Sequence, residues 1–139
     1  MSRTTLAIIK PDAFGAGNAG KILAHLEAAG FTLKAARVLR MTAEQAGAFY
    51  EVHRGRPFYD ELVAFMTSGR CMPLVLERDS AVSELRRVIG ATDPAEAAAG
   101  TVRKLFAESK GRNAIHASDS DENAVREASF FFAEADRLV

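Results

Sequence analysis

The stretch Asn113-Ala114-Ile115-His116-Ala117-Ser118-Asp119-Ser120 joins a short apolar segment to the start of a helix. Ala114 and Ile115 indicate a brief strand, and Ser120 belongs to the residue types that cap helix N-termini. Asp121 and Glu122 come next, and acidic side chains are favoured at the positive end of a helix dipole. His116 is therefore predicted to lie at a strand end, immediately before a helix.

The helix after Ser120 offers a partner for this histidine. We expect Val125, Ala128 and Phe132 to face the core, because their spacing suits one side of a helix. Glu127 lies one to two turns into the same helix. Its carboxylate is in a position to bind one ring nitrogen of His116 and so fix the ring's tautomer and orientation.

His116 is a candidate nucleophile for phosphoryl transfer. A histidine nucleophile divides the transfer into two easier steps, and a histidine in water is largely neutral at cellular pH, as attack requires. The free N–H groups of a helix start also favour an arriving phosphate. A lone histidine is more often structural, so these residues alone leave both interpretations open. His25 and His53 are weaker candidates, and the three histidines lack metal-ligand spacing.

Outward from this stretch, strands and helices alternate along the chain. Strands are predicted at Leu6–Ile9, within Phe31–Met41 with an irregularity near Ala35-Ala36, and at Leu74–Leu76 beside Pro73. Helices are predicted from Asn18 to Gly30, from Thr42 to about Glu51, around Leu62-Phe65-Met66, from Ser80 to Gly90, and from Asp93-Pro94. Residues 91–113 form a long excursion with short helical turns. These patterns indicate one α/β-type domain over residues 1–139.

The composition is that of an ordinary globular protein. Of 139 residues, 48% are hydrophobic and 26% charged, with 18 basic and 18 acidic side chains. This balance gives no argument for a nucleic-acid or membrane partner. Cys71 is the single cysteine, and no signal-peptide pattern is visible, so we expect a cytoplasmic protein.

The segment from Gly15 to Lys21 matches a dinucleotide-binding G-x-G-x-x-G pattern and nearly matches a P-loop. The P-loop requires Ser or Thr after its lysine, where this chain has Ile22. The dinucleotide motif requires an acidic residue after the next strand, where this chain has Arg37 and Arg40. A flexible turn before an ordinary helix is the simpler interpretation. A P-loop or dinucleotide protein remains the alternative.

Five motifs together resemble the nucleoside diphosphate kinase family. The histidine stretch resembles the family's N-x-x-H-G-S-D-S signature. The other motifs occur in family order and cover nearly the whole chain, namely Ile9-Lys10-Pro11-Asp12, Phe49-Tyr50 with Arg56-Pro57-Phe58, Gly90-Ala91-Thr92-Asp93-Pro94, and Gly100-Thr101-Val102-Arg103. Each motif alone is modest, but their joint order and spacing are highly specific.

This resemblance implies a role for each matching residue. His116 would carry the phosphoryl group on its δ nitrogen during ping-pong transfer between ATP and nucleoside diphosphates, with Glu127 and Ser118 supporting it. Phosphates would be bound by Lys10, Tyr50, Arg86, Thr92 and Arg103. Asn113 and Lys10 would reach the ribose, and Phe58 would stack on the base with Leu62 nearby. Magnesium would be held mainly by the nucleotide phosphates, with no dedicated protein ligands.

The resemblance also implies a ferredoxin-like α+β sandwich, with a four-stranded antiparallel sheet covered by helices, and a homo-oligomer (hexamer, tetramer or dimer). Two departures from the family pattern occur near the predicted site, and we expect the first to be tolerated. Ala117 replaces the usual glycine and would be crowded if that position needed positive φ. Lys104-Leu105 removes a usual acid. A second alternative is therefore a regulatory binding protein that keeps the fold with reduced activity.

Overall fold

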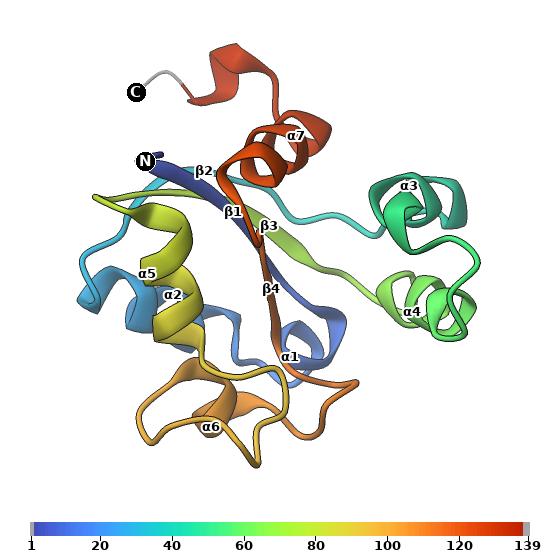
Figure 1. The fold of residues 1–139 in the computed structure, drawn as a ribbon, viewed down its shortest axis with the longest axis horizontal. Coiled ribbons are helices and arrows are strands. Elements are labelled where there is room, and N and C mark those ends of the chain that lie inside the picture. Colours follow the sequence, from blue (N-terminus) through green and yellow to red (C-terminus); the bar gives the residue numbers. More distant parts are fainter. Residues whose placement is uncertain (1, 138–139) are drawn as a thin grey trace.

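The protein is a four-stranded antiparallel sheet with helices on both faces, seen in a computed structural model that describes residues 2–137 (Figure 1). The strands lie in the order β2-β3-β1-β4 and comprise β1 (Thr4–Ile9), β2 (Thr32–Ala36), β3 (Met72–Glu77) and β4 (Ile115–Ala117). The α-helices are α1 (Pro11–Gly15), α2 (Ala19–Ala28), α3 (Ala43–Phe49), α4 (Tyr59–Met66), α5 (Ala81–Ile89), α6 (Val102–Phe106) and α7 (Asp121–Phe131). Two short 3-10 helices are η1 (Glu51–His53) and η2 (Glu134–Arg137).

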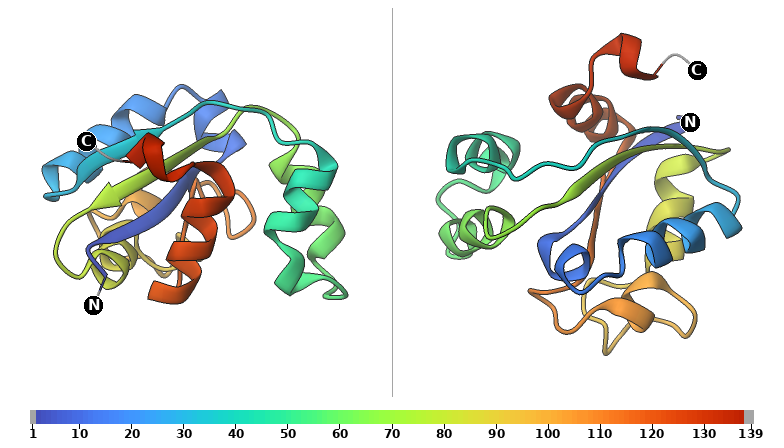
Figure 2. Two further views of the ribbon diagram at one scale, coloured as in Figure 1. Left: turned by 90° about the horizontal axis from the view of Figure 1, so that it is seen from above. Right: turned by 180° about the vertical axis from the view of Figure 1, so that it is seen from behind.

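Strand β1 lies inside the sheet, with β3 and β4 as its neighbours, so both of its faces are covered. Ala7 and Ile9 belong to a core cluster shared with α2 and α5. Leu6 and Ile8 belong to the opposite cluster, shared with α3, α4 and α7. Two faces of apolar contact explain why this strand is a continuous apolar run, since successive side chains point to opposite sides. Figure 2 shows the helices lying on the two sides of the sheet.

Most predicted elements are confirmed, including their local chemistry. The Thr42 hydroxyl accepts a hydrogen bond from the Gln45 N–H at 3.1 Å, and the Gln45 side chain accepts one from the Thr42 N–H at 2.9 Å. This reciprocal pair is a capping box, and it explains why α3 begins directly after Thr42. Strand β2 is shorter than its alternating segment, and its register with β3 shifts between Leu33 and Ala35, close to the predicted irregularity.

Two predictions about helices are wrong. Asp93-Pro94 begins only a turn, in which the Asp93 carboxylate accepts from the Ala95 N–H at 2.9 Å. Of residues 95–99 only Ala97 is buried, so a longer helix would lack the packing that offsets nucleation. Val125 does not face the core, because its surface is 63% exposed. The predicted Ala128 is buried in α7, together with Ala124, Glu127 and Phe131, and the predicted Phe132 is buried directly after the helix.

The antiparallel pairing of β1 with β4 brings the residues of the candidate site together. Ile8 pairs with His116 in the register of these antiparallel strands, and Lys10 follows the end of β1. The end of β1 therefore lies beside the start of β4.

Across residues 2–137, no helix has the length and apolarity that crossing a membrane requires.

Candidate active site

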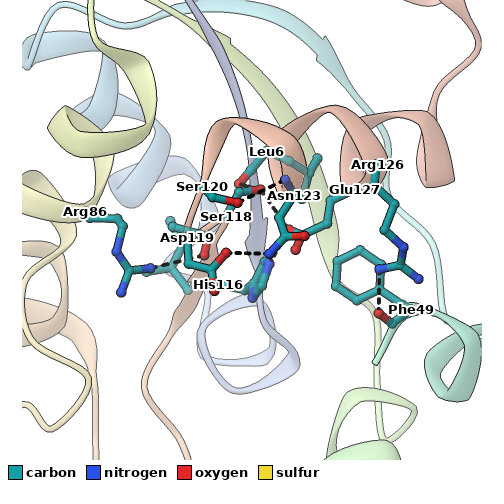
Figure 3. A network of polar contacts seen from close by, with 12 residues as sticks. Leu6, Phe49, Arg86, His116, Ser118, Asp119, Ser120, Asn123, Arg126 and Glu127 are labelled. Atoms are coloured by element: carbon teal, nitrogen blue, oxygen red, sulfur yellow. Dashed lines mark hydrogen bonds and ion pairs between the residues drawn. The ribbon is translucent and has the colours of Figure 1, made fainter. Parts of the chain in front are cut away.

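His116 lies in β4 and is held from α7 through a buried carboxylate (Figure 3). Its Nε2 atom lies 2.7 Å from Oε1 of Glu127. The same Oε1 accepts a hydrogen bond from the Ser118 hydroxyl at 2.7 Å. Ser118 is fully buried, and the His116 side chain is 20% exposed. The ring is thus fixed on one side by two polar partners and open to solvent in part.

This arrangement selects the nitrogen that can react. A carboxylate only accepts hydrogen bonds, so the Nε2 atom facing Glu127 is the one that carries the proton. The lone pair of the neutral ring is then on Nδ1. Glu127 is nine-tenths buried, and its negative charge would also stabilise positive charge on the ring during attack.

Two aromatic side chains from the end of α3 surround the histidine. Phe49 and Tyr50 meet the His116 ring edge-on, with centroids 5.4 and 6.1 Å away. Burial, followed by the negative charge of Glu127, raises the pKa of the Tyr50 hydroxyl, which therefore stays protonated and able to donate. Within residues 2–137 that hydroxyl has no hydrogen-bond partner. Tyr50 thus presents a free donor in the wall beside the ring.

Lys10 and Asn113 form a second polar pair next to the start of β4. The Lys10 ammonium donates to Oδ1 of Asn113 at 2.8 Å, and the Asn113 amide donates to the Thr92 carbonyl at 3.2 Å. Burial, with the positive charge of Arg103 as the next cause, lowers the pKa of Lys10 to about 8. An arriving anion would offset both effects, so this lysine is suited to bind a phosphate.

Two arginines bind the backbone on either side of His116. Arg103 donates to the Ile115 carbonyl at 2.7 Å and to the Gly90 carbonyl at 3.0 Å. Arg86 lies 3.5 Å from the Ala117 carbonyl. Both arginines and Thr92 line a cavity of about 430 Å³. Burial, then the charge of Arg86, lowers the pKa of Arg103 to about 10, so Arg103 remains cationic near neutral pH. Three arginines, Arg86, Arg87 and Arg103, thus line this cavity, with Glu96 as an acidic residue in the same lining.

Comparison with known proteins agrees with this chemistry. The family model for nucleoside diphosphate kinase matches residues 3–137. The chain belongs to the nucleoside diphosphate kinase family. It is 58% identical over 129 residues to a nucleoside diphosphate kinase of Chlorobium chlorochromatii, covering 93% of this chain and 92% of that one. A relative from Syntrophotalea carbinolica is 53% identical over 134 residues, with coverage of 96% and 98%.

Solved structures of this family have the same fold. The crystal structure of the Aquifex aeolicus nucleoside diphosphate kinase superposes with a TM-score of 0.96 at 47% identity, over 98% of this chain and 99% of that one. The halophilic enzyme of Halobacterium salinarum, solved in complex with CDP, gives 0.94 at 33% identity, over 100% and 93%. The ferredoxin-like sandwich is therefore confirmed, and the activity is that of a nucleoside diphosphate kinase, which moves the terminal phosphoryl group between nucleotides.

The predicted base-binding residues lie on a different part of this kinase fold. Phe58 and Leu62 belong to the helical hairpin formed by α3, η1 and α4, and Phe58 is 46% exposed. A row of rings connects Phe58 to the histidine, since His53 lies 5.2 Å from Phe58 and 6.3 Å from Tyr50 between centroids. The structure thus separates the surroundings of His116, called the phosphate end below for their predicted role, from an aromatic end at Phe58.

The remaining sequence features lie away from this arrangement. The glycine segment from Gly15 to Lys21 begins at the last residue of α1, and the rest of α1 lies between it and β1. It therefore does not form the direct strand-to-helix turn of a dinucleotide or P-loop motif. Ala117 is an extended residue of β4, and the non-glycine residues with positive φ in the described range are Ser80 and Ala114. The condition for crowding at residue 117, a positive φ, is therefore not met. The exposed Lys104 places its ammonium 3.4 Å from the Pro94 carbonyl.

Sequence reasoning missed two residues that support the site. Arg126 donates to the carbonyls of Ala48 and Phe49, at 2.8 and 2.9 Å, and so fastens the end of α3 to α7 (Figure 3). The Asp12 carboxylate accepts from the Ala114 N–H at 3.0 Å. The two contacts of Arg126 join residues 78 and 77 positions apart, and the contact of Asp12 joins residues 102 positions apart. Local sequence patterns cannot predict contacts over such separations. For Asp12, its place in the Ile9-Lys10-Pro11-Asp12 motif was the available signal.

Proposed function

We propose that this chain transfers phosphoryl groups in two half-reactions through a phosphohistidine on Nδ1 of His116. In the first, the Nδ1 lone pair attacks the γ-phosphorus of a nucleoside triphosphate. The N–P bond forms, the bond from phosphorus to the bridging oxygen breaks, and the diphosphate leaves with that electron pair. In the second, a terminal oxygen of another diphosphate attacks the phosphorus and the N–P bond breaks, which returns the neutral ring.

The observation that carries this proposal is the 2.7 Å contact between Nε2 of His116 and Glu127. It leaves Nδ1 as the unprotonated nitrogen and sets a negative charge beside the ring that becomes positive on attack. The proton remains on Nε2 throughout, so neither half-reaction needs a separate base. Ser118 holds the carboxylate through its own hydrogen bond and so supports the same geometry.

The phosphates would be bound by the cations around the cavity. We assign Arg86, Arg103 and Lys10 to the phosphate oxygens, with Thr92 and the free Tyr50 hydroxyl as neutral donors. Charge-assisted bonds from guanidinium groups suit these oxygens and strengthen as negative charge shifts during transfer. Asn113 and Lys10 would also reach the ribose hydroxyls. The CDP complex of the halophilic relative supports a diphosphate as one ligand of this fold.

Magnesium would enter with the nucleotide. Within the described part of the chain, no group of three or more His, Cys, Asp or Glu side chains is placed to hold a metal ion, and the cavity lining contains three arginines and one carboxylate, that of Glu96. This fits an ion coordinated by phosphate oxygens and water. When bound, it would neutralise charge on the β- and γ-phosphates.

Phe58 would stack on the base, with Leu62 beside it. Every base has a π-face, so stacking discriminates little among bases. The site would therefore accept nucleoside diphosphates with several different bases.

We also propose a cytoplasmic homo-oligomer. Family membership supports the assembly, and the order of the sheet leaves β2 and β4 as edge strands. Light scattering of the purified protein measures the number of subunits.

Labelling with γ-labelled ATP and magnesium tests the proposal. We expect an acid-labile, base-stable label on the protein that passes to GDP on chase. Protein that stays unlabelled, or that keeps its label in the presence of GDP, would refute it and favour a regulatory binding protein. Lys21→Ala is the control for the glycine segment. A P-loop protein would lose nucleotide binding in Lys21→Ala and would be unaffected by His116→Ala. We expect Lys21→Ala to keep nucleotide binding and His116→Ala to lose labelling and transfer.

A further inference from the structure

Ala114 adopts a backbone conformation that alanine rarely tolerates. Its φ is +74°, and the Ile115 N–H donates to the Asn113 carbonyl at 2.9 Å across it. This three-residue turn, with φ near +75°, is the rare and strained form. A Cβ in the left-handed region crowds the following carbonyl, so this turn must be held by its surroundings.

The turn connects residues that the proposed function uses. Asn113, on one side, contacts Lys10 and Thr92, and His116 lies two residues beyond Ala114 on the other side. A change in the backbone conformation of Ala114 would therefore move the Asn113 side chain and the start of β4 relative to each other. The relative position of Asn113 and His116 would affect the rate of transfer strongly, because in-line attack requires the nucleophile and the phosphate to be closely aligned.

Two hydrogen bonds from the end of β1 and the start of α1 hold Ala114. The Lys10 N–H donates to the Ala114 carbonyl at 2.9 Å, and the Ala114 N–H donates to Oδ2 of Asp12 at 3.0 Å. Ala114 itself is fully buried. Since both of its backbone polar groups are out of water, each needs a partner inside the protein, and Asp12 is the partner of the N–H.

The environment of Asp12 indicates that this bond is its main function. The residue is 7% exposed, and its second oxygen, Oδ1, is buried without a hydrogen-bond partner among residues 2–137. Burying a carboxylate is costly unless it is well bonded. The costly group here makes one strong bond, to the strained turn, and its charge also favours the charged form of Lys10.

We propose that Asp12 is a positioning residue, whose carboxylate holds Ala114 in its left-handed conformation and thereby aligns Asn113 and His116 for phosphoryl transfer. The alignment part of this inference rests on the proposed function. The coupling between Asp12 and Ala114 does not, because it concerns the backbone of the folded protein alone.

The test is a double-mutant cycle of Asp12→Ala, Ala114→Gly and their combination. We expect Asp12→Ala to lower kcat/KM for transfer from ATP to GDP on the order of 10²-fold, as misplacement of reacting groups does. Glycine adopts positive φ without strain, so Ala114→Gly should recover much of this loss in the Asp12→Ala background, to within about tenfold of the parent. In the parent background the same substitution should change kcat/KM little.

Matched controls separate this effect from general destabilisation. Asp136→Ala removes another carboxylate that accepts a backbone N–H, that of Ala133 at 2.9 Å, at the far end of the chain. Ser80→Gly relieves the other left-handed non-glycine residue in the described range, where φ is +51°. Neither should change transfer, and Ser80→Gly should not rescue Asp12→Ala. Rescue by Ser80→Gly would overturn the proposal, because it would show a global stability effect.

A second variant keeps the test decisive if Asp12→Ala fails to fold. Asp12→Asn retains an oxygen that can accept from the Ala114 N–H, so it should keep transfer within about tenfold of the parent. Transfer by Asp12→Asn as low as that of Asp12→Ala would overturn the proposal in favour of a charge effect. Transfer by Asp12→Ala within twofold of the parent would also overturn it.

A readout independent of activity distinguishes failure of this inference from failure of the proposed function. Urea unfolding of the four proteins of the cycle should show that Ala114→Gly stabilises the Asp12→Ala protein more than it stabilises the parent. The Ala114 amide should also exchange its hydrogen faster in Asp12→Ala. Strict additivity would overturn the coupling even in an active enzyme. An inactive parent that shows the coupling would refute the proposed function and retain the link between Asp12 and Ala114.

Discussion

The phosphate end and the aromatic end of this site are built in opposite ways. At the phosphate end the partly exposed His116 of β4 contacts Glu127 of α7, which also binds Ser118. Glu127, Ser118 and Arg103 of α6 are buried, and Arg103 binds the backbone next to the histidine. At the aromatic end Phe58 is 46% exposed on the helical hairpin, and its ring packs edge-on against the ring of His53.

The difference follows from what each end would have to recognise. Phosphoryl transfer requires donors and a nucleophile fixed before the substrate arrives, because reorganisation during the reaction raises the barrier. Base stacking needs only a flat apolar surface and should tolerate several bases. A rigid, buried phosphate end and an open aromatic end would together give fast chemistry with broad specificity. The predictions below test this division, from the largest expected effect to the smallest.

His116→Ala should nearly abolish transfer. Without the nucleophile the two half-reactions cannot occur, so we expect a loss of roughly 10⁴-fold or more and no labelling by γ-labelled ATP. His53→Ala, on the aromatic end, is the matched histidine control and should still be labelled. Labelling of His116→Ala at the parent level would place the nucleophile elsewhere and remove the division between the two ends.

Glu127→Ala should lower kcat on the order of 10²-fold and leave the affinity for diphosphates nearly unchanged. The carboxylate fixes the tautomer and stabilises the charged ring, so its loss acts on the chemical step. Steady-state kinetics with GDP measures both parameters. Glu122→Ala removes an exposed carboxylate from the same helix and should leave kcat unaltered. A rise in KM with unchanged kcat would mean that Glu127 belongs to binding.

Binding of diphosphate should weaken as pH rises above about 8, by up to about tenfold per pH unit. The pKa of Lys10 is lowered to about 8 by burial, so the free site loses this ammonium above that pH, and a bound anion restores it. Binding near pH 8.5 should therefore take up a proton. Titration calorimetry in buffers of different ionisation enthalpy detects this uptake, which Lys10→Met should eliminate. Equal uptake by Lys10→Met would assign the proton to another group.

The same shift of the Lys10 pKa affects stability in the opposite direction. The unfolded chain, with the ordinary lysine value of 10.5, binds more protons than the folded chain between about pH 8 and 10.5. The contribution of Lys10 to the free energy of unfolding is therefore constant below about pH 8 and rises across that range. Urea unfolding of the parent and Lys10→Met at pH 7 and 9.5 measures the difference.

Phe58→Ala should have the smallest effect, raising KM about five- to tenfold for GDP, CDP and UDP alike with little change in kcat. Its loss removes stacking surface but no group near the reacting atoms. Val52, 79% exposed on the same hairpin, provides the control, and Val52→Ala should leave KM unchanged. A large fall in kcat for Phe58→Ala would show that the aromatic end also aligns the phosphate.

Much of the fold could be predicted from local patterns. The capping residues Thr42 and Ser120, the stop at Gly90 and the apolar run of β1 each specify a local structure without help from distant residues. Helical spacing failed to predict which residues face the core where two neighbouring residues suited the buried face equally well. Val125 and Ala124 both suit a helix face with Ala128, and the sheet beneath α7 together with Glu127 decides which of them is inward.

The sequence by itself determined the residue types of the candidate site and that His116 would lie on a short strand just before a helix. Only the tertiary structure decided that Nε2 faces Glu127, that Arg103 and Arg86 bind on both sides of the histidine, and that Asp12 holds the strained turn at Ala114. The physical reason is distance along the chain. Caps and apolar periods act within a few residues, whereas the Asp12 contact joins residues 102 positions apart and exists only after β1 and β4 have paired.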